Sequence, residues 1–129
     1  GGNPAVCDDV SLLPQAPYVR TACCGQEGTI QAMDTAALGM AAQAMGAGRL
    51  SLEDQLDYSV GYILKVRIGD RVTPDTPLCE LHAKTEADAA RAEAAIRAAI
   101  RIGKEPCARA RNFYAVITAD GIQHIGENV

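Results

Sequence analysis

The sequence holds few of the residues that most often build an active site or an aromatic core. It has no tryptophan, a single phenylalanine (Phe113) and only two histidines, His82 and His124. The motifs G-x-S-x-G, H-E-x-x-H and G-x-x-x-x-G-K-[S/T] are absent, which removes the usual signatures of hydrolases, zinc peptidases and P-loop proteins. Almost half of the residues are hydrophobic, and most of these are small or aliphatic. The sequence therefore predicts a closely packed core of small side chains.

Charge and hydropathy exclude two classes of partner. The formal net charge is −4 at pH 7, and acidic residues interleave with the arginines that recur between positions 91 and 111. No basic stripe is therefore available to follow a phosphate backbone, and no nucleic-acid partner is expected. No apolar run approaches the roughly 20 residues that span a bilayer. No leader with a basic and then an apolar segment is found, so no membrane partner is expected.

The five cysteines are odd in number and form no C-x-x-C pair. Adjacent Cys23 and Cys24 cannot easily pair with each other. Reduced thiols that act as small hydrophobes, in a cytoplasmic protein, fit this pattern better than a disulfide framework. No metal site is predicted.

The stretch from Val60 to Lys84 carries the clearest β pattern. Apolar residues alternate with Lys65 and Arg67, which predicts a strand with one wet face. Gly69-Asp70 supplies turn chemistry, and a second strand is predicted over residues 78–82. We expect a curled β unit against which the rest of the chain packs.

Two alanine-rich helices flank this stretch. Asp34 is a good N-cap for a helix that ends in the glycine-rich segment 46–49. Thr85 begins a capping-box-like sequence, and the helix that follows is predicted to reach Ile102. Its charged residues, including Glu93 and Arg97 at i,i+4 spacing, are expected to form a solvated face. The pattern indicates an α+β fold with two packed helices.

The remaining strands are predicted as two hairpins. Residues 18–24 and 29–33 are expected to pair through a turn at 26–28. Phe113 to Ile125 contains an Asp-Gly turn, and this hairpin is expected to close an edge of the sheet.

Several residues invite a functional interpretation, but a structural one fits each better. His82 is either a general base or a hydrogen-bonded histidine at a strand end. Asp54 and Asp57 are either a carboxylate pair or part of a solvated loop. Segment 46–49 follows a helix rather than opening one, so a C-cap is favoured over an anion site. Lys65 is expected to be solvated.

Lys84 carries the alternative function. Biotin- and lipoyl-carrier domains also contain a strand, a G-D-x-V turn and a strand, and they present a lysine for modification. Lys84 is the natural candidate here. Against this, Leu-His-Ala precedes it, and the chain continues directly into a capped helix instead of a second β unit. A carrier domain modified at Lys84 stays as the alternative.

Several segments together resemble one enzyme family. They run in the same order and spacing as the C-terminal part of the thymidine and pyrimidine-nucleoside phosphorylases. They are GGNPAVCDDVSLLPQA at 1–16, Glu27-Gly28, ALGMAAQAMGAGR at 37–49, LDYSVG at 56–61, GDRV at 69–72 and LHAK at 81–84. The part from Phe113 onward matches least well.

The resemblance implies an α/β-hammerhead, a curled and mostly antiparallel sheet related to barrel-sandwich hybrids. It implies an enzyme that uses phosphate to cleave pyrimidine nucleosides into a free base and (deoxy)ribose 1-phosphate. In the family, the phosphate-binding stretch and the base clamp lie upstream of this region. No catalytic, cofactor-binding or metal-binding residue is therefore carried over, and no cofactor is expected.

The resemblance also implies an arrangement of domains. The chain starts with Gly-Gly-Asn-Pro and no methionine, so a piece of a longer protein is expected. Residues 1–17 would be the connector from a catalytic body, and residues 18–129 the C-terminal domain. Phosphate and nucleoside would bind upstream, and the full-length protein would be a cytoplasmic homodimer. Preference between thymidine and uridine is not encoded in this region.

Overall fold

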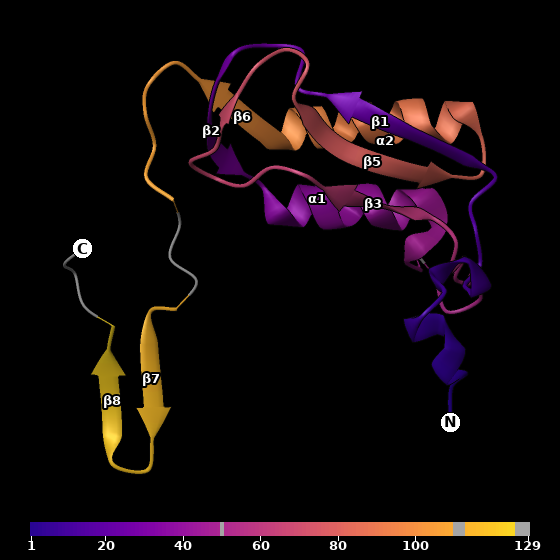
Figure 1. Ribbon diagram of the computed structural model, residues 1–129, viewed down its shortest axis with the longest axis horizontal. Coiled ribbons are helices and arrows are strands. Elements are labelled where there is room, and N and C mark those ends of the chain that lie inside the picture. Colours follow the sequence, from indigo (N-terminus) through magenta and orange to yellow (C-terminus); the bar gives the residue numbers. More distant parts are fainter. Residues whose placement is uncertain (50, 110–112, 126–129) are drawn as a thin grey trace.

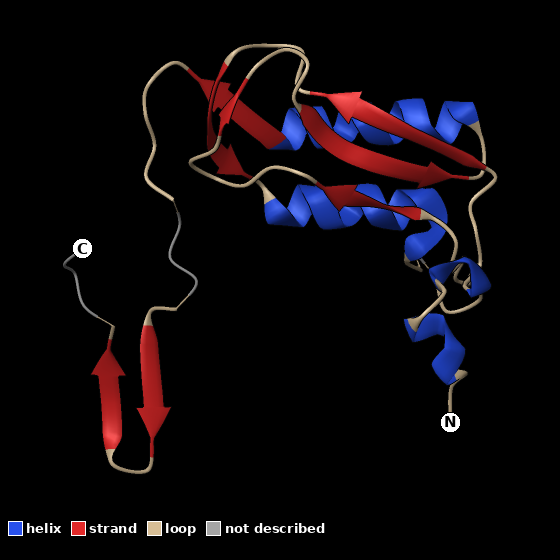
Figure 2. Cartoon of the chain, viewed as in Figure 1, coloured by secondary structure: helices blue, strands red, loops and turns tan. Residues whose placement is uncertain are grey.

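The structure, a computed structural model, describes residues 1–49, 51–109 and 113–125 of the chain. Within these ranges two α-helices and three open antiparallel sheets are found, which confirms the α+β class (Figures 1 and 2). Sheet A has the spatial order β1 (Tyr18–Cys23), β5 (Pro77–Ala83), β3 (Gly61–Leu64), and sheet B the order β4 (Arg71–Val72), β2 (Gly28–Met33), β6 (Ile100–Gly103). The third sheet is a hairpin of β7 (Ala115–Thr118) and β8 (Gly121–His124).

Helix α1 (Thr35–Ala42) begins where the sequence predicts it. The Asp34 carboxylate accepts a hydrogen bond from the Ala37 amide at 3.0 Å, so it is the predicted N-cap. Leu38 and Ala41 are buried. The helix continues as a π-helical turn over Gln43–Ala47, and Gly46 ends it with a φ of 104°, a conformation that glycine adopts without strain. Segment 46–49 is thus a helix end, as predicted.

Gly39 lies inside α1, where no close neighbour requires a glycine. The residue is exposed, and a Cβ built there would meet no atom within 4 Å. We therefore predict that Gly39→Ala raises the free energy of unfolding by about 0.5–1 kcal/mol, because alanine has less backbone freedom to lose in a helix. Urea denaturation followed by circular dichroism measures the change. The matched variant Gly46→Ala should destabilise, since its φ of 104° is strained for alanine. A Gly39→Ala protein less stable than wild type would contradict the prediction.

Helix α2 (Glu86–Ala99) starts at the predicted cap and ends earlier than predicted. The Thr85 side chain accepts from the Asp88 amide at 3.1 Å. The prediction of a helix to Ile102 is wrong, because Ile100 has extended backbone angles and begins β6. Ile100 and Ile102 pair with Met33 and Ile30 of β2. Pairing with a distant strand thus overrides the local helical pattern.

The unit from Val60 to Lys84 connects the two sheets. β3 pairs with β5 in sheet A, and the chain then crosses to sheet B, where Gly69 donates to the Ile30 carbonyl at 2.8 Å. β4 pairs with β2, and β5 returns to sheet A between β1 and β3. The Gly69-Asp70 bend is present, with a φ of 91° at Gly69, but it leads the chain onto β2 rather than closing a hairpin.

The prediction that the first two strands pair with each other is wrong, because each of them pairs with more distant strands. β1 pairs with β5 and β2 pairs with β4 and β6, so β1 and β2 lie in different sheets. The segment between β1 and β2 donates backbone hydrogen bonds to the residues just before β5. Cys24 donates to the Thr76 carbonyl at 2.8 Å, and Gly25 donates to the Pro74 carbonyl at 2.9 Å. These contacts separate the two strands.

The core is built from small and aliphatic side chains, as predicted. Helices α1 and α2 pack side by side, and α2 also packs on β5 and β1 (Figure 1). The Asp34 amide donates to the Ala99 carbonyl at 2.8 Å, which joins the start of α1 to the end of α2. The largest fully buried side chains are Ile30, Leu78, Leu81, Ile96 and Cys79.

Two peripheral segments lie outside this core. Residues 1–17 contain two short 3-10 turns, Pro4–Cys7 and Val10–Leu12, and no buried residue. The hairpin at 113–125 forms as predicted, but it does not close an edge of a sheet. In the described part of the chain β7 and β8 pair only with each other, and they lie clear of the helices and of sheets A and B (Figure 1).

Candidate functional site

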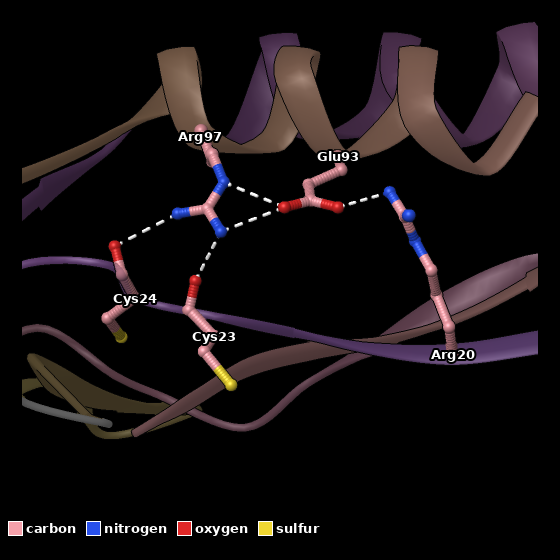
Figure 3. A network of polar contacts seen from close by, with 5 residues as sticks. All are labelled: Arg20, Cys23, Cys24, Glu93 and Arg97. Carbon is pink, nitrogen blue, oxygen red and sulfur yellow. Dashed lines mark hydrogen bonds and ion pairs between the residues drawn. The ribbon is translucent and has the colours of Figure 1, made fainter. Parts of the chain in front are cut away.

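A network of two arginines and one glutamate joins α2 to the end of β1 (Figure 3). Arg97 donates to Glu93 from Nε at 3.0 Å and from a terminal nitrogen at 2.8 Å. The same guanidinium donates to the Cys24 carbonyl at 2.9 Å and to the Cys23 carbonyl. The other oxygen of Glu93 is paired with Arg20 on β1. The prediction that Glu93 and Arg97 form a solvated face is therefore wrong.

The network is suited to holding structure rather than to chemistry on a ligand. Both Glu93 oxygens and all three Arg97 nitrogens have protein partners. Arg20 Nε is buried without a hydrogen-bond partner among the described residues. The spacing of Glu93 and Arg97 signals their ion pair, but nothing local in the sequence signals Arg20, because it lies 73 residues from Glu93.

A second cluster lies on the face of sheet A that carries Val19 and Ile63. His82 Nε2 lies 2.9 Å from Glu80 Oε1, and Lys65 Nζ lies 3.4 Å from Glu80 Oε2. His82 is therefore a hydrogen-bonded strand histidine, which confirms the structural interpretation. The hydrogen bond from His82, with the charge of Lys65 second, lowers the pKa of the Glu80 carboxyl below its usual 4.5. Lys65 is exposed but ion-paired.

The lowered pKa of Glu80 predicts a pH dependence of stability. The folded protein binds the Glu80 proton more weakly than the unfolded chain does, so the contribution of Glu80 is fully present above the unfolded pKa near 4.5. It is lost as the pH falls through the folded pKa. The stability difference between wild type and Glu80→Gln should therefore shrink as urea unfolding is measured from pH 7 downward. Glu53→Gln, on an exposed loop, is the control. A difference between wild type and Glu80→Gln that stays constant with pH would contradict this.

Lys84 lies between β5 and α2, not at the tip of a hairpin. Its Nζ is 3.2 Å from Asp57 Oδ2, while more than half of the side chain is exposed. The other Asp57 oxygen accepts from the Ser59 amide and hydroxyl at 2.9 and 2.6 Å, and these bonds lower the pKa of Asp57. Asp54 instead accepts from Ser51. The two aspartates thus anchor separate turns, as the loop interpretation predicts.

The thiols are not arranged as nucleophiles or metal ligands. All five cysteines are free. Burial raises the pKa of Cys79 to about 11 and also raises the pKa of Cys24, so neither forms the reactive thiolate at neutral pH. Within the described ranges no three histidine, cysteine or acidic side chains gather in a way that could hold a metal ion.

The surface is hollowed over sheet B. A cavity of about 520 Å³ there is lined by Gly28, Thr29, Val72 and Thr73 together with the exposed side chains of Glu27, Arg71 and Lys104. These charges have mixed sign, and no general base stands beside a nucleophile. Of the helices described, none has the length and apolarity to cross a membrane.

One comparison with known proteins identifies the chain. A family model described as the pyrimidine nucleoside phosphorylase C-terminal domain matches residues 29–103, which is more than half of the chain. The matched region runs from the second residue of β2 to the end of β6 and includes both α-helices. The resemblance found in the sequence is thereby confirmed. The chain belongs to the pyrimidine nucleoside phosphorylase C-terminal domain family.

Proposed function

We propose that the chain is the C-terminal structural domain of a thymidine or pyrimidine-nucleoside phosphorylase, with the reacting groups on other domains. Family membership carries the proposal. The charged side chains of the described region support it, because several of them form ion pairs and hydrogen bonds with one another. Glu93 is bonded to Arg20 and Arg97, Glu80 to His82 and Lys65, and Asp57 to Lys84.

The chemistry of the reaction explains why other domains are needed. A phosphate oxygen attacks C1′ of the sugar as the bond from C1′ to the base nitrogen breaks, and the base leaves with that electron pair. Positive charge develops on the sugar and negative charge on the base. The enzyme must hold phosphate beneath the sugar and donate hydrogen bonds or cationic groups to the base. The paired side chains described above offer no such free donors at one place.

The role proposed for this domain is to brace the phosphate-binding lobe while the enzyme closes on its substrate. Residues 1–17 would be the connector from the catalytic body and residues 18–129 the domain, folded as the α/β-hammerhead of the family. The full-length enzyme would be a cytoplasmic homodimer joined mainly through another domain. Phosphate and nucleoside would be bound by that body.

Phosphorolysis of thymidine and uridine tests the proposal. We expect no release of free base by the 129-residue chain alone, full activity of the full-length enzyme, and reduced activity or stability of the enzyme lacking residues 18–129. Phosphorolysis by the isolated chain at a rate comparable to that of the full-length enzyme would overturn it.

The carrier alternative has its own test. Co-expression with biotin or lipoate ligases followed by intact-mass measurement would reveal an acylated Lys84, with Lys84→Arg as the control. We expect the unmodified mass, because Lys84 is ion-paired to Asp57 and is followed at once by the cap of α2.

A further inference from the structure

The cavity over sheet B lies where three strand ends meet. β2 runs antiparallel to both β4 and β6, so its first residues lie beside the last residues of these two strands (Figure 1). Residues at all three strand ends therefore line one hollow of about 520 Å³, which we call the sheet B cavity. Sites for small organic molecules usually have volumes of roughly 300–1,000 Å³. The sheet B cavity is thus large enough for such a ligand.

Thr29 supplies a buried hydroxyl to the sheet B cavity. The residue is only 4% exposed, and its neighbour Ile30 is fully buried in the core, so the Thr29 side chain leaves the opposite face of β2. No hydrogen bond joins the Thr29 hydroxyl to a described residue. In the described ranges only Arg20 Nε is sealed from solvent without a partner. The Thr29 hydroxyl is therefore open to the cavity that the residue lines and is free to bind a ligand.

Two cations line the same cavity. Arg71 is the cross-strand partner of Thr29, so the two side chains lie on the same face of sheet B. Lys104 directly follows the last residue of β6. Neither cation forms an ion pair with a described residue, whereas six other lysines and arginines do. A guanidinium, an ammonium group and a hydroxyl are together suited to donate hydrogen bonds to the oxygens of a phosphate group.

Glu27 and the volume of the cavity argue for more than a bare phosphate ion. The exposed Glu27 carboxylate, which also lacks an ion pair with a described residue, repels an anion but accepts hydrogen bonds from hydroxyl groups. An inorganic phosphate ion, the size of a few water molecules of roughly 30 Å³ each, would fill only a small part of the cavity.

We propose that the sheet B cavity binds a small phosphate monoester that carries hydroxyl groups, as a sugar phosphate does. Arg71, Lys104 and the Thr29 hydroxyl hold the phosphate, and Glu27 accepts hydrogen bonds from the hydroxyl groups. This site does not depend on the proposed enzymatic function, which assigns the reacting phosphate to another domain.

Titration of the full 129-residue chain with ribose 5-phosphate, inorganic phosphate and ribose, followed by two-dimensional amide NMR, tests the proposal. We expect saturable shift changes centred on residues 27–29, 71–73 and 104. Ribose 5-phosphate should bind at least about fivefold more tightly than inorganic phosphate, because of the added hydrogen bonds to Glu27. Ribose should not bind, because it lacks the phosphate.

Matched double variants test the role of the two cations. Arg71→Ala/Lys104→Ala should weaken the binding of ribose 5-phosphate at least about tenfold, because hydrogen bonds to a charged group are lost. Arg67→Ala/Arg101→Ala removes the same two charges from exposed side chains that do not line the cavity. It should leave the affinity unchanged at 0.15 M salt, where charges farther apart than about 8 Å are largely screened.

Two single variants test the other groups. Thr29→Val keeps the shape of the side chain and removes the hydroxyl, so it should weaken binding about fivefold. Glu27→Ala should narrow the preference for ribose 5-phosphate over inorganic phosphate. Circular dichroism checks that all variants stay folded.

The wild-type titration can overturn the proposal by itself. The absence of saturable binding, shift changes centred elsewhere, or inorganic phosphate binding as tightly as ribose 5-phosphate would each do so. So would an equal loss of affinity in the two double variants, full affinity of Thr29→Val, or a preference that Glu27→Ala leaves unchanged.

Discussion

Replacing Ile96 by alanine is expected to lower the free energy of unfolding by about 3 kcal/mol, the largest effect that we predict for a single side chain. Ile96 lies on α2 with 0% of its surface exposed and belongs to the hydrophobic core cluster of the described residues. The substitution removes buried methyl and methylene groups and leaves a cavity, for which losses of about 2–5 kcal/mol are typical. The better helix propensity of alanine offsets only a few tenths of this.

Urea denaturation followed by circular dichroism measures the loss. The matched variant is Ile63→Ala on β3, which makes the same chemical change at a side chain that is 50% exposed. It should lose less than about 1.5 kcal/mol, because much of the side chain is already in water. Equal losses at the two positions would contradict the idea that burial of the side chain sets the cost of its removal.

The second large effect is expected at Glu93. Glu93→Ala leaves the guanidinium groups of Arg20 and Arg97 without their shared carboxylate in a half-buried site. Complete burial would predict a loss of 3–5 kcal/mol for removing one partner. The three side chains are 21–37% exposed, so solvent screens them, and we expect about 2 kcal/mol.

A double-mutant cycle shows whether Arg20 and Glu93 act together. Arg20→Met combined with Glu93→Ala should cost less than the sum of the two single losses, because the first change removes a charge that the second would leave unpaired. Arg91→Ala is the control, since Arg91 pairs with Asp88 but is 72% exposed, and it should change stability by less than about 0.5 kcal/mol. Strictly additive losses would contradict coupling between Arg20 and Glu93.

For most candidate functional residues, local sequence patterns predicted a structural role instead of a functional one. The interpretation of His82 as a bonded strand histidine, of segment 46–49 as a helix end and of Asp54 and Asp57 as loop residues agrees with the observed contacts. These interpretations depend on residues within a few positions of each side chain. The network around Glu93 was only half predictable, because the contributions of Arg20 and of the Cys23 and Cys24 carbonyls come from β1.

The sequence by itself determined the elements whose causes are local. Asp34 and Thr85 cap their helices, Gly46 ends the π-helical turn that continues α1, and the Asp-Gly turn at 120–121 makes the hairpin. Capping and turn formation need only neighbouring residues, so they can be predicted without the fold.

Only the tertiary structure decided which strands pair. β1 joins β5, β2 joins β4 and β6, and Ile100 leaves the helix to extend sheet B. The hairpin at 115–124 remains outside both of these sheets. Strand partners are chosen by contacts between residues far apart in the chain, and several pairings satisfy the same alternating pattern equally well. Helix α2 packs on β5 and β1 of sheet A, and such a contact between distant segments is not encoded in any single one of them.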